Sequence, residues 1–496
     1  MKIKNISKEL NDLHKKVKEI ADSYGLDSFP MIFQLCDNEA INTLAARDGF
    51  PVRYPHWRFG MSYNQMRNQQ EFGWGKIYEM VINTDPCYAY LLNTNEFLDQ
   101  KLVMAHVYGH GDFFKNNEWF ASTNRDMMNT MATNSSKIKR YMKKYGEDKV
   151  ERFIDQVLSL ENLISQKDMF KIKDEKKELV ETESDYKDKF SSSLKKYIKT
   201  NELKDEKKED ETINLNKLNS PERDILKFLA DEAPLENWES DIISMLREEA
   251  YYFLPQRMTK IMNEGWASYW HSEIMTKHLL EASEIVDYAD INSSVLYMDQ
   301  KNINPYKIGV ELFRYIKEKW DKGQFGIDYM ECDDLYLKDN WDTKAMLGTK
   351  KIFEVRKIYN DLTFLDEFLT EEFCKKHKLF VYKQDPRTGK FFIDSTDFPA
   401  IKEQLLTQLT NAGSPVIEAV DSNYKNRNEL LLEHRHYGTD LDVSYAKETM
   451  KNLFKIWKRP VHIKTKIKEE NKRQTEEVIK EVIFSFDENG FDEKFI

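Results

Sequence analysis

The chain has 496 residues, more than one ordinary hydrophobic core accommodates, so we expect two or three domains. Its formal net charge of −11 argues against a dedicated nucleic-acid-binding protein, which usually carries a basic footprint the size of a domain. Glycine (17 residues) and proline (12 residues) are each near half of their usual share, which leaves few turn positions for an all-β fold and favours helices.

Cysteine usage and hydropathy indicate the compartment. The four cysteines are widely spaced and form no CxxC pair, so neither a disulfide framework nor a thiolate zinc knuckle is expected. The N-terminal segment lacks the apolar core of a signal peptide, and no apolar run approaches the roughly 18 residues that span a bilayer. We therefore expect a cytoplasmic protein without a membrane span.

The first part of the chain alternates between helical and extended patterns. Residues 6–25 have apolar side chains at helical spacing and predict an amphipathic helix. Residues 71–93 alternate apolar and polar positions around Asp85-Pro86, which predicts two short strands or a hairpin. From Thr94 the pattern becomes helical again, with Asn95 as the expected N-cap, so the segment His106-Val107-Tyr108-Gly109-His110 should lie on a helix.

A dense run of Lys, Glu and Asp with few aromatic residues follows at about residues 167–219 and predicts a solvated linker or insertion. Order should resume at Ser220-Pro221, where proline at a first helical position marks a helix start. Apolar periodicity predicts four later helices. They cover residues 238–255, 258–280, 305–319 and 350–372.

After Lys378 the chain consists of short β-prone runs separated by turn residues, with one helix expected at 444–458 and an antiparallel sheet. The predicted fold class is therefore α+β, with a large, mainly helical N-terminal domain and a smaller C-terminal α+β domain. Four segments follow from these patterns. They are a first helical half (1–166), the charged linker (167–219), a second helical half (220–377) and the C-terminal domain (378–496).

The best candidate for chemistry is a divalent-metal site. His106 and His110 are four residues apart on a predicted helix and project from the same face. At this spacing two imidazoles can bind the same metal ion. Glu264, on a later helix, would complete a His₂Glu site, a ligand set typical of zinc that leaves a position for water. His271 is a candidate fourth ligand, and Glu248 and Glu249 are substitutes for Glu264. The alternative is that both histidines are satisfied side chains of a polar helix face.

Catalysis at such a site needs a proton acceptor. In zinc peptidases with the pattern H-E-x-x-H, the glutamate after the first histidine takes the proton of the attacking water, but here that residue is Val107. Candidate acceptors from elsewhere are Glu118, Glu248 and Glu249, and Tyr108 is a candidate hydroxyl donor to an oxyanion. The sequence therefore leaves open whether the protein is a metal-dependent hydrolase or a non-catalytic relative of one.

Two further clusters carry weaker signals. His56, Trp57 and Arg58 lie in a loop-like segment that suits either a ligand or a packed corner. His434 and His436 lie two apart on an expected strand and face the same side, which suits metal binding only with a third ligand. No phosphate-binding loop, dinucleotide-binding glycine pattern or nucleophile elbow is present, so ATP use and serine hydrolysis are unsupported.

The chain resembles the SpoVR family, the stage V sporulation protein R family. The resemblance is carried by long, unusual segments spread over most of the chain. They are FPVRYPHWRFG, EMVINTDPCYAYLLN, MAHVYGHGDFFKNN, FLADEAP, EEAYYFLPQ, KIMNEGWASYWHSEI, KIFEVRKIYNDLTFLDEFLTEE, PVIEAVDSNYKNRNELLLEHRHYG and WKRPVHI.

The resemblance implies a cytoplasmic bacterial protein connected in spore formers with formation of the spore cortex. If the protein is a non-catalytic regulator or scaffold, we expect other sporulation or stress-response proteins as its partners. The resemblance brings no assigned reaction. HVYGH and NEGWASY are also similar to the metal-binding helices of gluzincin peptidases, which implies a gluzincin-like helical core rather than a particular activity.

Overall fold

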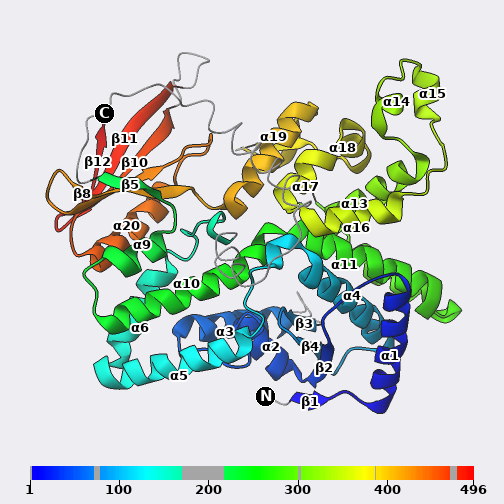
Figure 1. The fold of residues 1–496 in the computed structure, drawn as a ribbon, viewed down its shortest axis with the longest axis horizontal. Coiled ribbons are helices and arrows are strands. Elements are labelled where there is room, and N and C mark those ends of the chain that lie inside the picture. The colour runs from blue at the N-terminus through cyan, green and yellow to red at the C-terminus, as the bar shows by residue number, and fades with distance from the viewer. Residues whose placement is uncertain (1–2, 72–78, 170–216, 300–302, 386, 470–477) are drawn as a thin grey trace, which may run out of the picture. The chain divides into compact units, whose positions relative to one another are not determined.

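The computed structural model describes residues 3–71, 79–169, 217–299, 303–385, 387–469 and 478–496. The chain forms two compact units (Figure 1). Unit 1 comprises residues 1–144 and 252–413, and unit 2 comprises residues 145–251 and 414–496. Both contain helices and strands, which confirms the α+β class. The boundaries of the two units differ from those of the four segments predicted from the sequence. Most of the predicted charged linker, residues 167–219, lies outside the described residues.

Unit 1 contains a four-stranded sheet of order β1-β2-β4-β3. Its strands are β1 (Ile3–Asn5), β2 (Met31–Cys36), β3 (Glu79–Ile82) and β4 (Cys87–Leu92). β3 and β4 pair antiparallel, which confirms the strands predicted in residues 71–93. β2 and β4 run parallel, so the chain between them must cross over, and it does so through two helices. These are α2 (Asn38–Ala46) and α3 (Trp57–Glu71).

Unit 1 has further helices, and most of them contribute buried residues to one large apolar core. They are α1 (Lys8–Ser23), α4 (Phe97–Asn116), α5 (Met127–Tyr145), α11 (Lys260–Ile274), α12 (Ile285–Val295), α13 (Pro305–Lys322), α14 (Gly326–Met330), α15 (Leu335–Asp339), α16 (Gly348–Ile358), α17 (Asp361–Phe368), α18 (Glu371–His377) and α19 (Phe398–Leu409). A two-stranded ribbon, β6 (Val381–Gln384) and β7 (Phe391–Ser395), precedes α19. The single helix expected at 350–372 is interrupted, because Asn360 begins a new helix as the N-cap of α17.

Helix α4 carries both candidate histidines, as predicted, but it begins later than expected. Its N-cap is Glu96 rather than Asn95, and Glu96 and Asp99 form a reciprocal capping box. Most side chains of α4 are buried, including His106 and His110, because the helix is packed on several sides. The site therefore lies inside unit 1 and not on a solvated helix face.

Glycines let α11 approach two other helices closely. A Cβ atom added to Gly109 of α4 would lie 2.6 Å from the Cα atom of Ala267 on α11. On another face of α11, a Cβ atom added to Gly265 would lie 2.4 Å from the backbone of Gly309 on α13. Real Cβ atoms do not approach backbone so closely, so α11 fits between α4 and α13 only with glycine at these positions. Glu264 is next to Gly265, and this close packing fixes its position against α4.

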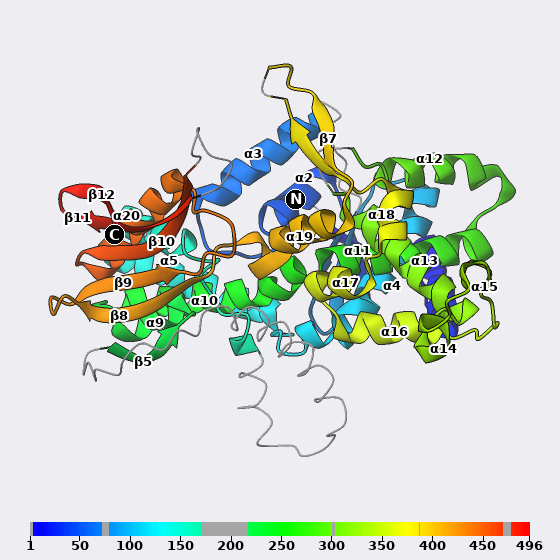
Figure 2. The same ribbon diagram turned by 90° about the horizontal axis from the view of Figure 1, so that it is seen from above.

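Unit 2 is built on a six-stranded sheet of order β12-β11-β10-β9-β8-β5 (Figure 2). Its strands are β5 (Lys217–Glu222), β8 (Ile417–Tyr424), β9 (Glu429–His434), β10 (Val461–Glu469), β11 (Val478–Asp487) and β12 (Gly490–Phe495). The expected antiparallel sheet is wrong in one pair, because β9 and β10 run parallel. The connection between them is α20 (Val443–Trp457), the helix predicted at 444–458, and a helical crossover is what a parallel pair requires.

Three more helical segments belong to unit 2. They are α6 (Glu147–Leu158), α9 (Ile225–Glu232) and the part of α10 (Asn237–Met258) before residue 252. The predicted helix start at Ser220-Pro221 is wrong: these residues lie in β5, and α9 begins after Asp224, whose carboxylate accepts a hydrogen bond from the Lys227 N–H. Among the described residues, no helix is both long and apolar enough to cross a membrane.

Candidate metal centre

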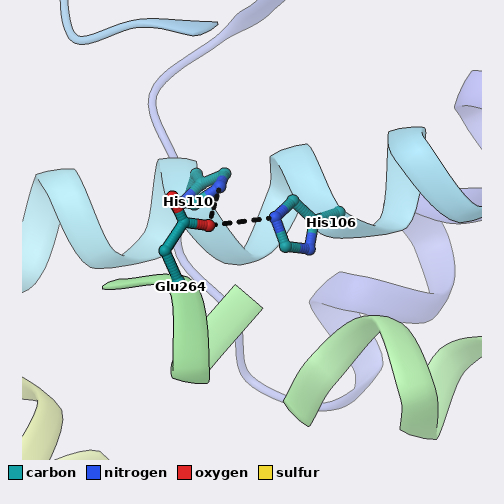
Figure 3. Close-up of side chains that lie close together, drawn as sticks. All are labelled: His106, His110 and Glu264. Atoms are coloured by element: carbon teal, nitrogen blue, oxygen red, sulfur yellow. Dashed lines mark ion pairs between the residues drawn. The ribbon is translucent and has the colours of Figure 1, made fainter. Parts of the chain in front are cut away.

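Three side chains converge between α4 and α11 (Figure 3). The Nε2 atoms of His106 and His110 each lie 3.5 Å from Oε2 of Glu264. The two imidazole rings are nearly perpendicular, with centroids 4.5 Å apart. One ligand atom from each residue lies within 4.8 Å of the other two, so the structure brings together the three residues that the sequence singled out.

The spacing of these atoms matches the edge of a coordination polyhedron. At 3.5 Å, the nitrogen and oxygen atoms are farther apart than in an ordinary hydrogen bond. Zinc bonds of about 2.0–2.1 Å in tetrahedral geometry separate neighbouring ligand atoms by about 3.3–3.4 Å. Both nitrogen–oxygen distances are therefore close to those between neighbouring ligands of one ion.

A buried oxygen atom points to the same conclusion. Oε2 of Glu264 is inaccessible to solvent and has no hydrogen-bond partner in the part of the chain that the structure describes. A buried carboxylate oxygen without a partner costs free energy, and a cation between it and the two imidazoles would satisfy it. The donor set of two nitrogens and one carboxylate suits zinc.

The outward-facing nitrogens of both imidazoles have partners. Nδ1 of His110 lies 2.9 Å from Oδ1 of Asn263, and a proton on that nitrogen leaves the Nε2 lone pair directed at Glu264. Nδ1 of His106 lies 3.0 Å from Nδ1 of His271, so one of these two rings donates to the other. When His106 is the donor, its Nε2 atom is likewise free to bind a cation.

Burial and local charge set the protonation states. Burial and the neighbouring His106 lower the pKa of His110 to about 4, and burial lowers the pKa of His271 well below its usual value. Burial opposes ionisation of Glu264, but its interactions with His106, His110 and Tyr306 outweigh burial and lower the pKa of the carboxyl group. At neutral pH the site therefore presents a neutral His110 imidazole and a carboxylate, the states that bind metal ions.

A cavity of about 540 Å³ opens beside the three residues. His106 and Glu264 both line it, so a bound ion would face the cavity on one side. The rest of the lining is partly polar and partly apolar. It comprises Glu79, Asp99, Leu102, Val103, Lys260, His271, Ile291, Asn292, Val295, Asn304, Pro305 and Tyr306.

Among the polar residues of this cavity that sequence reasoning missed, two interact with the proposed ligands. Burial raises the pKa of Glu79 on β3, with His106 acting in the opposite direction and the negative charge of Glu264 raising it further. Tyr306 on α13 hydrogen-bonds to Glu264, and its pKa is raised mainly by burial. The only signal in the sequence was an acidic residue at the start of the otherwise apolar strand EMVI, because Tyr306 looks like an ordinary residue of a helix start.

The other candidates for catalysis lie elsewhere. The Tyr108 hydroxyl is 2.7 Å from Nε2 of His14 on α1, and its ring contacts Phe33. Glu248 and Glu249 belong to unit 2, and Glu118 lies on a short 3₁₀ helix. None of these four is among the residues that line the described cavity. His271, the candidate fourth ligand, contacts His106 through Nδ1 and is outside the group of three convergent ligand atoms.

The weaker clusters are placed as follows. His56 is buried against the Tyr54 and Phe59 rings, whereas Trp57 is 55% exposed at the start of α3. His434 pairs with Thr465 (Nδ1 to Oγ1, 2.8 Å) and His436 with Asp440 (Nε2 to Oδ1, 2.6 Å). Neither histidine belongs to a group of three potential ligands among the described residues.

The fold is α+β, and His106, His110 and Glu264 converge inside unit 1 as a group that could hold a metal ion. Comparison with known protein families identifies the family of this chain. Residues 4–414 match the family described as SpoVR like protein, and residues 415–468 match the SpoVR-like C-terminal domain. The chain therefore belongs to the SpoVR family, as its sequence motifs indicated.

A curated relative is similar over most of its length. It is the "Uncharacterized protein YcgB" of Escherichia coli (strain K12), 27% identical over 489 residues that cover 89% of each chain. No solved structure matches. The boundary between the two family matches, at residues 414/415, agrees with the last division between the structural units, at 413/414.

Proposed function

We propose that this SpoVR-family protein binds one divalent metal ion, zinc, through His106, His110 and Glu264, and uses it to hydrolyse a small amide or peptide. The observation that carries the proposal is the equal 3.5 Å spacing of two imidazole nitrogens from one buried, otherwise unpartnered carboxylate oxygen. A bound ion of this kind lowers the pKa of a water molecule and polarises a carbonyl group.

The cavity distinguishes this proposal from a purely structural site. Structural zinc sites are closed by four protein ligands, whereas catalytic sites have three and leave a position for water or substrate. Three residues converge here, and two of them line a cavity of about 540 Å³. That volume lies in the range of sites that bind small ligands. A short peptide or an amide of similar size fits it better than a folded polymer does.

A non-catalytic role is the second candidate, and Val107 favours it. This residue occupies the position of the usual proton acceptor and is fully buried in apolar surroundings. On this view the metal centre stabilises a degenerate, gluzincin-like core that binds other sporulation or stress-response proteins. An ion with an exchangeable water ligand would support the hydrolase, and an ion closed by four protein ligands would support the structural role.

We further propose that the protein acts in the cytoplasm and, in spore-forming bacteria, serves formation of the spore cortex. This rests on the family name alone. The Escherichia coli relative is described only as uncharacterized, and its description does not mention sporulation. The proposed reaction should therefore not require sporulation. Cleavage of a small amide meets that condition.

The first experiment is metal analysis. The purified protein, loaded with zinc and passed through a chelating column, should retain one zinc ion per chain, and the variant His106→Ala/His110→Ala should retain none. The matched control is His278→Ala, because His278 contacts Tyr24 and does not line the cavity. Zinc retained by the double variant would refute the proposed ligands.

A further inference from the structure

A hydrolase with valine at position 107 needs a proton acceptor from another element. The cavity has three acidic residues in its lining: Glu79, Asp99 and Glu264. Glu264 is a proposed ligand, and Oδ2 of Asp99 accepts the Glu96 backbone N–H at the start of α4. Glu79 is the acidic residue of this lining that has neither of these roles.

The position of Glu79 fits a group that acts on a water molecule next to the ion. Its strand, β3, forms an edge of the four-stranded sheet and delivers the side chain to the cavity that His106 and Glu264 line. Its charge interacts with both of these residues. It is nevertheless outside the group of convergent ligand atoms, so it lines the cavity without belonging to the proposed set of ligands.

No hydrogen bond or ion pair holds the Glu79 carboxylate within the described part of the chain. A carboxylate in a desolvated cavity without a structural partner costs free energy, and such groups concentrate where chemistry requires them. Tyr306, another polar residue of the lining, is already engaged by its hydrogen bond to Glu264. Glu79 is therefore available to a water molecule or substrate in the cavity.

We propose that Glu79 is the catalytic proton acceptor that replaces the glutamate missing at position 107; this rests on the proposed hydrolase function. Glu79 takes a proton from the attacking water while the water oxygen forms a bond to the carbonyl carbon of the amide. The carbon–nitrogen bond then breaks, and Glu79 returns the proton to the departing nitrogen. The products are a carboxylic acid and an amine, and no redox partner is needed.

The test uses a probe that does not depend on knowing the substrate. Acetohydroxamic acid binds metal ions through two oxygen atoms, and a neighbouring carboxylate accepts the hydrogen bond of the bound group. The full-length protein is loaded with cobalt(II), and binding of acetohydroxamic acid is followed by the change in the visible absorption of the metal. Wild type is compared with Glu79→Gln and with Glu273→Gln, which removes a charge from α11 outside the cavity lining.

We expect Glu79→Gln to keep its metal and to bind acetohydroxamic acid about 10- to 100-fold more weakly, as the loss of a charge-assisted hydrogen bond predicts. Glu273→Gln should bind it nearly as well as wild type. Unchanged binding by Glu79→Gln would overturn the inference, and loss of metal from this variant would make Glu79 a ligand instead. If wild type holds no metal, or holds it without binding the probe, the hydrolase proposal fails first and the inference fails with it.

Discussion

Gly265 on α11 faces Gly309 on α13 so closely that a Cβ atom on Gly265 would lie 2.4 Å from the Gly309 backbone. Replacing Gly265 with alanine should therefore push the two helices apart and destabilise the protein by about 1–3 kcal/mol, as overpacking of a core does. Because Glu264 is the neighbouring residue, zinc affinity should fall as well. Chemical denaturation measures the first effect, and chelator competition measures the second.

The matched control for that substitution is Gly60→Ala. Gly60 lies in helix α3, and nothing lies within 4 Å of the Cβ atom it lacks. Alanine has the higher helix propensity, so this variant should be unchanged or stabilised by up to about 1 kcal/mol. Similar denaturation midpoints for Gly265→Ala and wild type would show that α11 and α13 can separate at little cost.

Glu264→Gln keeps the size of the side chain but removes the charge that we propose binds the ion. Zinc affinity should fall by more than the roughly 10- to 100-fold typical of a residue that only supports a ligand. Titration of zinc under a competing chelator measures the change. Glu273→Gln is the control, because Glu273 lies on the same helix and pairs with Lys277. Equal affinities of Glu264→Gln and wild type would exclude Glu264 as a ligand.

Asn263→Ala removes the oxygen that lies 2.9 Å from Nδ1 of His110. Without this acceptor the His110 ring loses the contact that fixes its orientation and proton position, so zinc affinity should fall by about 10- to 100-fold. Asn263→Asp should retain most of the affinity, since a carboxylate also accepts from Nδ1. If Asn263→Ala binds zinc as well as wild type, the contact does not support the metal centre.

Tyr108→Phe tests whether the Tyr108 hydroxyl contributes to stability or to the proposed reaction. The Tyr108 hydroxyl lies 2.7 Å from Nε2 of His14, so its removal should lower stability by about 1 kcal/mol. Zinc content and hydroxamate binding should not change, because Tyr108 does not line the cavity. A selective loss of hydroxamate binding with unchanged stability would return Tyr108 to the list of catalytic candidates.

His434 in unit 2 should make stability depend on pH. Burial, with a smaller effect of His436, lowers the pKa of His434 to about 4. An unfolded histidine titrates near 6.5, so between about pH 4 and 6.5 the unfolded state binds more protons and stability falls as the pH decreases. His434→Gln should remove about 1 kcal/mol of the loss between pH 7 and pH 5, allowing for solvent screening. Denaturation of both proteins at the two pH values checks this, and an equal pH dependence would contradict it.

Much of the fold could be predicted because its signals are local. The helix that carries His106 and His110, the two strands in residues 71–93 and the helix at 444–458 all follow from apolar periodicity and turn residues. The wrong predictions occur where the local sequence pattern competes with strand pairing in the folded protein. Pro221 suggested a helix start, yet its segment pairs with β8 as strand β5. The expected antiparallel sheet contains the parallel pair β9 and β10, because pairing partners are chosen across the fold.

The sequence alone therefore determined the family, the α+β class and the two imidazoles at helical spacing, since each depends on residues that are close in the chain. Tertiary structure decided which acidic residues meet them. Glu264 arrives from 154 positions after His110 because glycines let α11 pack closely against α4 and α13, and Glu79 arrives from the edge of a sheet. Glu248 and Glu249, the substitutes for Glu264 in the sequence analysis, belong to unit 2. The positions of distant carboxylates in the sequence do not predict which of them line the same cavity, because this depends on how the helices and strands pack.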